Sequence, residues 1–265
     1  MDLTTLIGIL LGIISLIMGF LLEGGHARSL LQITAAMIVF GGTFGAVIAG
    51  TPFRVLKKLP YILKMAFMER KFNPEDTIED LVELSQLSRR EGLLALESEA
   101  ERFEDDSFMF EGLQLTIDGV EAELIRDILD REMQLYEERH LEVAKVFEKA
   151  GGFSPTMGII GTVMGLVHVL GNLENPDTLG GSIAVAFIAT LYGVASANVI
   201  YFPLQHKIQA RVQQELLIKE LQSEGLLSIQ HGENPNILRK KLSAFVEKKK
   251  TDSSENEQVE ASEVS

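Results

Sequence analysis

Two apolar runs near the middle of the chain carry hydroxyl groups but no Asp, Glu, Lys or Arg. Residues 153–171 contain Thr162, and residues 179–203 contain Thr190 and Tyr192. Hydroxyl and backbone oxygens can replace part of the hydration shell of a hard cation, although a Thr hydroxyl can equally bond to a carbonyl of its own helix. Ion pathways in membranes usually include a charged side chain. If ions pass these runs, the charged carrier must therefore lie on another chain.

Both runs are long enough to cross a membrane. At about 1.5 Å per residue, roughly 20 apolar residues span a hydrocarbon core of roughly 30 Å, and residues 3–22 and 30–50 meet the same criterion. The sequence therefore predicts an all-α integral membrane protein with four transmembrane helices. Three glycine pairs have the spacing that lets membrane helices approach closely: Gly8/Gly12, Gly41/Gly45 and Gly161/Gly165.

The composition excludes several classes of protein. The 265 residues are 46% hydrophobic yet carry a formal net charge of -14, and they include no Cys. Disulfides and thiolate metal sites are therefore excluded, and the negative charge argues against nucleic acid as a partner. Because the sequence has no phosphate-binding Gly loop, metal-ligand spacing or nucleophile elbow, we expect no enzyme, no cofactor and no permanently bound metal.

Basic residues indicate the orientation in the membrane. Arg54, Lys57, Lys58 and Lys64 follow the second run, and Lys207 follows the fourth, whereas the two short loops within the pairs of runs hold one basic residue between them. By the positive-inside rule, both termini are cytoplasmic.

The sequence divides into five predicted segments. They are transmembrane helices 1 and 2 (1–51, spans about 3–22 and 30–50), a cytoplasmic helical domain (52–150), transmembrane helices 3 and 4 (151–204, spans about 153–171 and 179–203), a cytoplasmic C-terminal helical region (205–250) and a disordered acidic tail (251–265). Asn73 and Pro74 predict a helix start, and Gly151-Gly152 predicts a hinge at the mouth of the third span. Residues 51–67 form an amphipathic connection suited to the membrane surface.

Charged residues surround Gly92 in the soluble part. Arg89 and Glu97 lie within residues 88–97, SRREGLLALE. Such charges are typical of a solvated helix surface, where ion pairs three or four residues apart contribute only about 0.2–0.5 kcal/mol each. On their own they indicate no function.

Taken together, these features resemble the MotA family of flagellar stator subunits. The resemblance covers nearly the whole chain, and its most specific motifs are SRREGLLALE, FEKAGGFSPTMGIIGTVMGLV and ATLYGVASANVIYFP. Within the family the chain is similar to the sodium-driven PomA and MotP branch. Thr162 stands where proton-driven members tend to carry Ala, and residues 190–193 match the TLYG of the sodium-type fourth span. The resemblance implies a multi-pass protein of the bacterial inner membrane that transports sodium, with the proton as the alternative cation.

The resemblance also implies partners and roles for particular residues. Members act with a single-span partner of the MotB, PomB or MotS type, whose Asp carries the ion, in a complex of five copies of this chain around two of the partner. The complex turns the rotor protein FliG. By resemblance, the rotor contacts are Arg89 and Glu97, the conformational prolines are Pro155 and Pro203, and the ion pathway includes Thr162, Thr190 and Tyr192.

Two alternatives remain at this point. Energisers of outer-membrane transport, of the ExbB and TolQ type, share the long cytoplasmic insert, but they have three spans and an outer N-terminus. A membrane enzyme could use His168 with a Ser or Thr, but the apolar runs hold no acid that could orient the imidazole. Neither alternative matches the pattern as well as a stator subunit.

Overall fold

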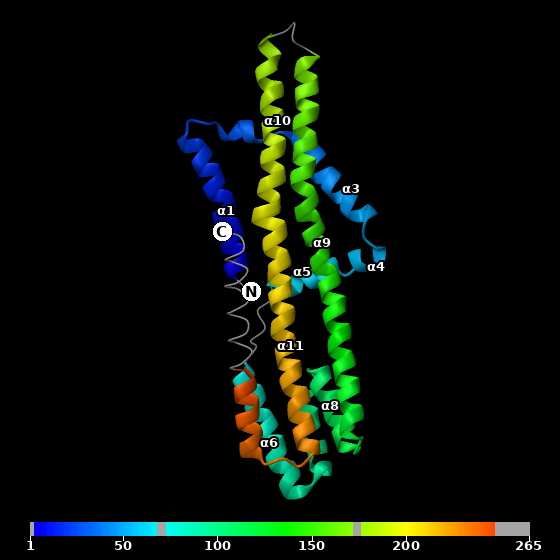
Figure 1. The fold of residues 1–265 in the computed structure, drawn as a ribbon. Coiled ribbons are helices and arrows are strands. Elements are labelled where there is room, and N and C mark those ends of the chain that lie inside the picture. Colours follow the sequence, from blue (N-terminus) through cyan, green and yellow to red (C-terminus); the bar gives the residue numbers. More distant parts are fainter. Residues whose placement is uncertain (1–2, 68–72, 172–175, 247–265) are drawn as a thin grey trace. The chain divides into compact units, whose positions relative to one another are not determined.

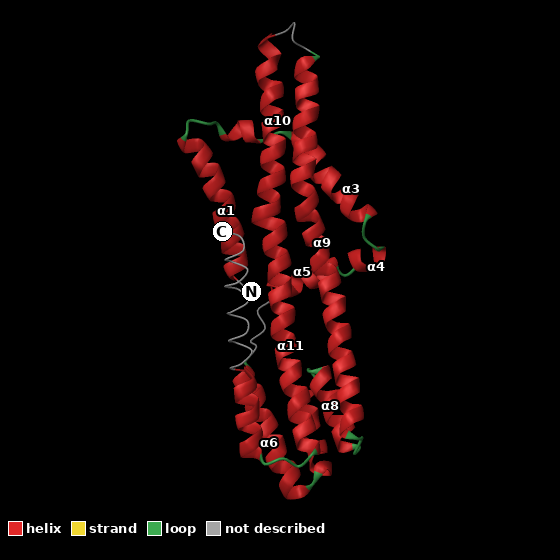
Figure 2. Cartoon of the chain, viewed as in Figure 1, coloured by secondary structure: helices red, strands yellow, loops and turns green. Residues whose placement is uncertain are grey.

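The computed structural model describes residues 3–67, 73–171 and 176–246, and within these ranges the chain is helical, without a strand (Figure 2). Four of the described helices are long and apolar enough to cross a membrane: Thr4–Leu22, Ala27–Ala49, Ala122–Leu170 and Leu179–Gln230. The predicted all-α class with four apolar spans is therefore confirmed. The predicted tail, 251–265, lies outside the described residues.

The first two apolar helices and two short helices after them form the N-terminal region (Figure 1). The second apolar helix, Ala27–Ala49, is built from several short elements. The N-terminal region consists of α1 (Leu3–Leu22), the 3-10 turn η1 (Ala27–Leu30), α2 (Ile33–Ala36), the π-helical turn η2 (Met37–Gly41), α3 (Gly42–Ala49), α4 (Phe53–Leu56) and α5 (Leu59–Phe67). Because Pro60 has no N–H to give to the carbonyl of Leu56, the helix is interrupted by a turn at residues 57–58.

The next described helices lie between residues 74 and 117. They are α6 (Pro74–Glu91), η3 (Leu93–Leu96), α7 (Glu97–Ala100), η4 (Glu101–Phe103) and α8 (Ser107–Ile117). The Asn73 side chain accepts a hydrogen bond of 3.3 Å from the N–H of Glu75, and Pro74 occupies the first helical position, so the predicted helix start is confirmed. The helix ends at Gly92, whose φ of +89° favours glycine.

Long helices complete the chain. They are α9 (Ala122–Leu170), α10 (Pro176–Ser196), the π-helical turn η5 (Ala197–Tyr201) and α11 (Phe202–Gln230), followed by helical residues 235–246. The predicted hinge at Gly151-Gly152 is wrong, because α9 continues through both residues. A Cβ at Gly151 would lie 2.6 Å from Cε1 of Phe202. The glycine therefore allows α9 and α11 to pack closely and does not interrupt α9.

The contacts divide the chain into two compact units. Residues 1–70 and 139–211 form the first unit, and residues 71–138 and 212–265 form the second, so α9 and α11 contribute to both. The sequence-based boundaries at 51/52 and 150/151 rest instead on the expected position of the membrane. They remain a prediction.

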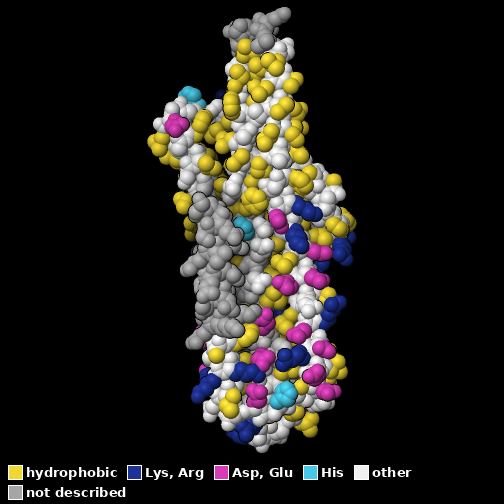
Figure 3. Space-filling view, in the orientation of Figure 1, with side chains coloured by type: hydrophobic (Ala, Val, Ile, Leu, Met, Phe, Trp, Pro, Cys, Tyr) yellow, Lys and Arg dark blue, Asp and Glu magenta, His cyan; other side chains and the backbone are white. Residues whose placement is uncertain are grey.

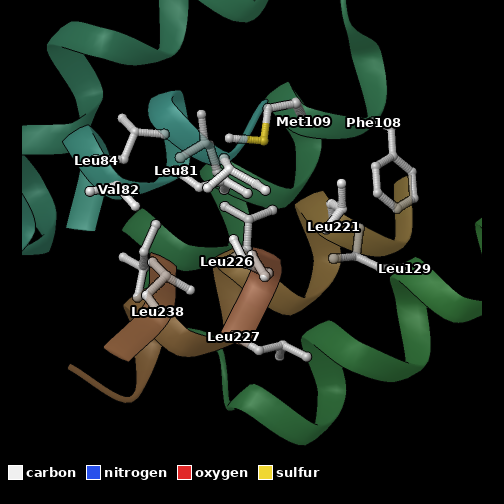
Figure 4. Packing of buried hydrophobic residues seen from close by; sticks show 14 of the residues in the cluster. Leu81, Val82, Leu84, Phe108, Met109, Leu129, Leu221, Leu226, Leu227 and Leu238 are labelled. Carbon is white, nitrogen blue, oxygen red and sulfur yellow. The ribbon is translucent and has the colours of Figure 1, made fainter. Parts of the chain in front are cut away.

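A hydrophobic core holds the second unit together (Figure 4). Side chains from α6, α8, α9, α11 and residues 235–246 meet there, among them Leu81, Phe108, Leu129, Leu226 and Leu238, which are 0% exposed. Fully burying a side chain of this size contributes about 1.5–3 kcal/mol. This core explains why the helices of the second unit keep their apolar faces inward.

Lys219 enters the edge of this unit between two aromatic rings. Its Nζ lies 4.0 Å from the ring centroid of Phe108, 5.2 Å from that of Tyr136 and 3.7 Å from Oε1 of Glu132. Burial lowers the pKa of Lys219, while the carboxylates of Glu132, Asp106 and Glu215 act in the opposite direction. Burial also raises the pKa of Glu132. The ammonium thus joins α8, α9 and α11 at a single point.

The first unit has a small interior and a large apolar exterior. A buried cluster of Ala35, Val39, Ile188 and Ala189 joins the second apolar helix to α10. Many large apolar side chains of α1, α9 and α10 are exposed instead (Figure 3). Such an exterior fits a protein surrounded by lipid or by other membrane helices.

Candidate functional site

The candidate site lies where small residues let α9 and α10 approach closely. A Cβ at Gly161 would lie 2.6 Å from Cβ of Ala189, and one at Gly165 would lie 2.7 Å from Cβ of Ala186. The predicted packing role of the Gly161/Gly165 pair is therefore confirmed. By contrast, no described heavy atom of this chain lies within 4 Å of such a Cβ at Gly41 or Gly45.

This close approach brings Thr162 and Thr190 into direct contact. Their Oγ1 atoms form a hydrogen bond, and Oγ1 of Thr162 also lies 3.1 Å from the carbonyl oxygen of Gly158 and 3.0 Å from that of Ala186. We define these four oxygens as the oxygen cluster. Each oxygen has two lone pairs. The two hydroxyl hydrogens and the helical N–H groups of Thr162 and Thr190 fill only part of them, so lone pairs remain for a further donor or a cation.

The chemistry of the oxygen cluster suits a cation. Oxygen ligands are those that hard cations prefer, and a site needs several of them to replace bound water. The described residues contain no group of three or more His, Cys, Asp or Glu that could hold a metal ion. The cluster itself carries no charge, and a carboxylate beside it would strengthen the binding of a cation.

The structure directs Tyr192 away from the two threonines. Its hydroxyl donates to the carbonyl of Leu30 and accepts a hydrogen bond of 3.2 Å from the N–H of Gln32. Its ring stacks on Phe40, with 5.9 Å between centroids. These hydrogen bonds tie α10 to the start of the second apolar helix. The assignment of Tyr192 to the ion pathway together with Thr162 and Thr190 remains a prediction.

Pro155 lies inside α9 beside a tight helix contact. A Cβ at Gly193 of α10 would lie 2.5 Å from the carbonyl oxygen of Ser154 and 3.2 Å from Cα of Pro155. Since Pro155 has no N–H, the carbonyl of Gly151 loses its usual helical donor. A weakened α9 is thus held against α10 at this level.

A buried pair of hydroxyls lies at the same level, and sequence reasoning missed it as a pair. Oγ of Ser154 lies 2.7 Å from Oγ of Ser196, and Ser196 donates to the carbonyl of Gly193 at 3.1 Å. Because Ser196 has one hydroxyl hydrogen, Ser154 is the donor between the two. The signal in the sequence is a Ser next to the proline on one span and a Ser among small residues on the other.

Pro203 stands at the start of α11, directly after the π-helical turn η5. Without an N–H, it cannot bond to the carbonyl of Val199, and the helix widens where that bond is missing. A Cβ at Gly12 of α1 would lie 2.9 Å from Cγ1 of Val199. The widened turn therefore also forms the contact with α1.

Arg89 and Glu97 lie on the surface of the second unit. Arg89 belongs to the last turn of α6, Glu97 begins α7, and both are exposed on either side of the turn at Gly92. Neither forms an ion pair with another described residue. Their charges are therefore available to a partner protein.

Comparisons with known proteins agree along most of the chain. Residues 6–92 match the family model "Motility protein A N-terminal", and residues 100–223 match "MotA/TolQ/ExbB proton channel family". "Motility protein A" of Bacillus subtilis is 39% identical over 93% of this chain and 91% of its own length. The chain belongs to the motility protein A family. "Chemotaxis protein PomA" of Vibrio alginolyticus is 36% identical over 93% of this chain and 95% of its own length.

Solved structures of the motility protein A family share this fold. "Structure of the flagellar MotAB stator complex from Bacillus subtilis" matches with a TM-score of 0.86 and 38% identity, covering 91% of this chain and 94% of that one. "Structure of C. jejuni MotAB" matches with a TM-score of 0.87 and 30% identity, covering 92% and 96%. The chain is therefore a membrane-embedded stator-type subunit.

Family membership decides between some of the alternatives and leaves others open. The match to the N-terminal motility model and the full-length similarity to motility proteins argue against a transport energiser of the ExbB or TolQ type, and against a membrane enzyme. The identities of 39% and 36% do not separate the sodium-driven branch from the proton-driven one.

Proposed function

We propose that this chain is the ring-forming stator subunit of a flagellar motor driven by sodium. Family membership supports the stator role. The oxygen cluster at Thr162 and Thr190 supports the ion, because two hydroxyls and two carbonyls can replace part of the hydration shell of sodium, whereas a proton needs no such set of ligands.

A second subunit of the MotB, PomB or MotS type supplies the carboxylate that the oxygen cluster lacks. The solved structures of the relatives from C. jejuni and Bacillus subtilis are of MotAB, which supports a partner of this kind. In the proposed complex, five copies of this chain surround two of the partner, and a partner carboxylate completes the coordination of the ion beside Thr162. Tyr192 contributes by holding the neighbouring apolar helix in place.

Torque passes from the membrane to the rotor protein FliG. We assign the contact to Arg89 and Glu97, which are exposed and form no ion pair among the described residues. Pro155 and Pro203 act as the conformational prolines, since each removes a backbone hydrogen bond from a helix that must change shape. Both termini lie in the cytoplasm, and the apolar helices lie in the inner membrane.

The test is the sodium dependence of motor speed. Thr162→Ala and Thr190→Ala should each raise the external sodium concentration that gives half-maximal speed, by roughly tenfold if one ligand contributes about 1.4 kcal/mol. Thr156→Ala is the matched control, since Thr156 lies in the same span but is exposed and donates to the carbonyl of Phe153 in its own helix. Speed is measured at fixed membrane potential, with protein levels in the membrane followed in parallel.

The proton is the second candidate ion, because one matching family model is described as a proton channel family. If the parent motor turns at full speed without sodium, the proton replaces sodium and the stator role is retained. Identical sodium curves for the parent and both Thr variants would reject the oxygen cluster as the ion site.

A further inference from the structure

The connection between α3 and the soluble part presents aromatic side chains to its surroundings. We define residues 53–64, from α4 into α5, as the interfacial segment. Val55 and Ile62 are 3% and 2% exposed and face inward, whereas Phe53 and Tyr61 are each 70% exposed. Exposed aromatic residues on an amphipathic helix are typical of a membrane–water interface.

Basic side chains alternate with these aromatic ones. Lys57 and Lys64 lie on the exposed face with Phe53 and Tyr61, at spacings of three and four residues, and Nζ of Lys57 lies 4.9 Å from the ring centroid of Phe53. Among the described residues, Lys57 and Lys64 form no ion pair. The exposed face is therefore positive and lacks counter-charge from this part of the chain.

The interfacial segment is fixed at the end of an apolar span. Nζ of Lys149 donates to the carbonyl of Gly50 at 2.7 Å, and Arg54 pairs with Glu142 at 3.2 Å, so two contacts tie this region to α9. Figure 3 shows Lys and Arg side chains gathered around α4 beside the apolar surface of the first unit. The segment thus begins where the hydrocarbon core is expected to end.

We propose that the interfacial segment is a binding site for the head groups of anionic phospholipids. Lys57, Lys58 and Lys64 contact the phosphates, while Phe53 and Tyr61 insert beside the first methylenes of the acyl chains. Charge complementarity selects an anionic partner. The two exposed rings select a lipid over free phosphate or an acidic protein surface, because burying them requires an apolar phase next to the charge.

The chain contains no Trp, so Tyr61→Trp places one fluorescent reporter in the segment of each full-length chain. The variant, purified with its partner subunit, is reconstituted into mixed vesicles of phosphatidylcholine and phosphatidylglycerol. The acyl chains of one lipid or the other carry bromine at equal mole fraction, and the emission of the parent complex is subtracted. We expect brominated phosphatidylglycerol to quench at least about twofold more than brominated phosphatidylcholine.

Three comparisons make the test specific. The preference for phosphatidylglycerol should disappear in a triple variant that carries Lys57→Gln, Lys58→Gln and Lys64→Gln. A control variant removes the same charge from exposed positions elsewhere, by Arg131→Gln, Arg139→Gln and Lys240→Gln. It should keep the preference. Leu94→Trp, at a position 73% exposed in the second unit, should show no quenching by either lipid.

The outcomes separate the possible partners of the segment. Equal quenching by the two brominated lipids would mean membrane contact without selection of charge, and no quenching would place the segment away from the bilayer; both results overturn the proposal. Inorganic phosphate added at constant ionic strength should leave the preference unchanged, and its loss under this condition would identify a free-phosphate site instead. None of these measurements depends on which ion drives the motor.

Discussion

At the scale of single residues, hydroxyl groups of the first unit have two distinct tasks. Thr162 and Thr190 form a cluster rich in acceptor oxygens, whereas Ser154, Ser196 and Tyr192 satisfy backbone or side-chain partners. Polarity within an apolar helix therefore does not by itself indicate an ion pathway. Which groups can bind a cation follows from the oxygen lone pairs that remain once the hydroxyl and backbone N–H hydrogens are assigned.

At this scale, Tyr192→Phe tests the tie between α10 and the second apolar helix. The variant keeps the ring stacked on Phe40 but removes the hydroxyl that bonds to the backbone of Leu30 and Gln32. We expect it to reduce the free energy of unfolding by about 1–2 kcal/mol and to leave the sodium dependence of motor speed unchanged. Thermal unfolding of the purified complex and speed curves measure the two effects. A shift in the sodium curve without loss of stability would return Tyr192 to the ion pathway.

At the scale of elements, the prolines of the third and fourth apolar helices have different effects on helix geometry. The π-helical turn η5 precedes Pro203, and α9 stays continuous across Pro155 because α10 packs against it through Gly193. The loss of one backbone hydrogen bond at a proline thus has different results in the two helices. The helix widens before Pro203, whereas α9 stays regular at Pro155, where α10 packs against it.

Pro203→Leu restores a backbone donor next to η5. The carbonyl of Val199 can then be satisfied by a regular helical bond, so the widened turn should revert to an α-helix and stiffen. We expect normal protein levels in the membrane with motor speed at high load reduced several-fold. Pro235→Leu, at the start of the helical residues 235–246, is the matched control and should turn normally. Normal speed of the Pro203 variant at high load would reduce this proline to a helix terminator.

Lys219→Met tests the contact that joins α8, α9 and α11. Burial lowers the pKa of Lys219 below its ordinary 10.5, so between the folded pKa and 10.5 the unfolded chain binds more protons. Stability of the parent should therefore rise as the pH increases through this window. Methionine fills a similar volume without charge but leaves Glu132 without its partner. The variant should therefore be less stable than the parent at neutral pH, and the rise should disappear.

Thermal unfolding of the complex between neutral pH and pH 10.5 measures this difference. The control Lys240→Met removes an exposed lysine and should keep the rise of the parent. An equal slope for the parent and the Lys219 variant would show that other groups govern stability at high pH.

At the scale of the whole molecule, the proposed ion site and the proposed rotor contact belong to different units. The oxygen cluster belongs to the first unit, and Arg89 with Glu97 belongs to the second. Both α9 and α11 contribute to both units. Continuous helices of this length can carry a change in the membrane part to the soluble part.

Reversal of the rotor charges tests this division. Arg89→Glu together with Glu97→Lys should strongly reduce torque while changing stability by no more than about 0.5 kcal/mol, because both positions are exposed and unpaired among the described residues. Torque of tethered cells and the protein level in the membrane are measured together. Arg131→Glu with Glu138→Lys reverses two exposed charges elsewhere in the same unit and should leave torque unchanged. Normal swimming of the first variant with an unmodified rotor protein would contradict the assignment.

The sequence by itself determined the class of the protein. Length and apolar character are local properties, so the four spans and the helix start at Asn73 could be predicted without tertiary contacts. The contact between Thr162 and Thr190 could also be foreseen, because an antiparallel hairpin of known loop position pairs residues at equal depth. Even so, the packing of Gly161 and Gly165 against α10 was needed to show that the two hydroxyls meet.

Tertiary structure alone decided the rest. Gly151 looks like a helix breaker in the sequence, but Phe202 explains it as a packing position, because glycine can be selected for closeness as well as for flexibility. The direction of the Tyr192 hydroxyl depends on Leu30, which lies 162 residues away in the chain. No local pattern encodes such a partner, since the chain must first bring two distant helices together.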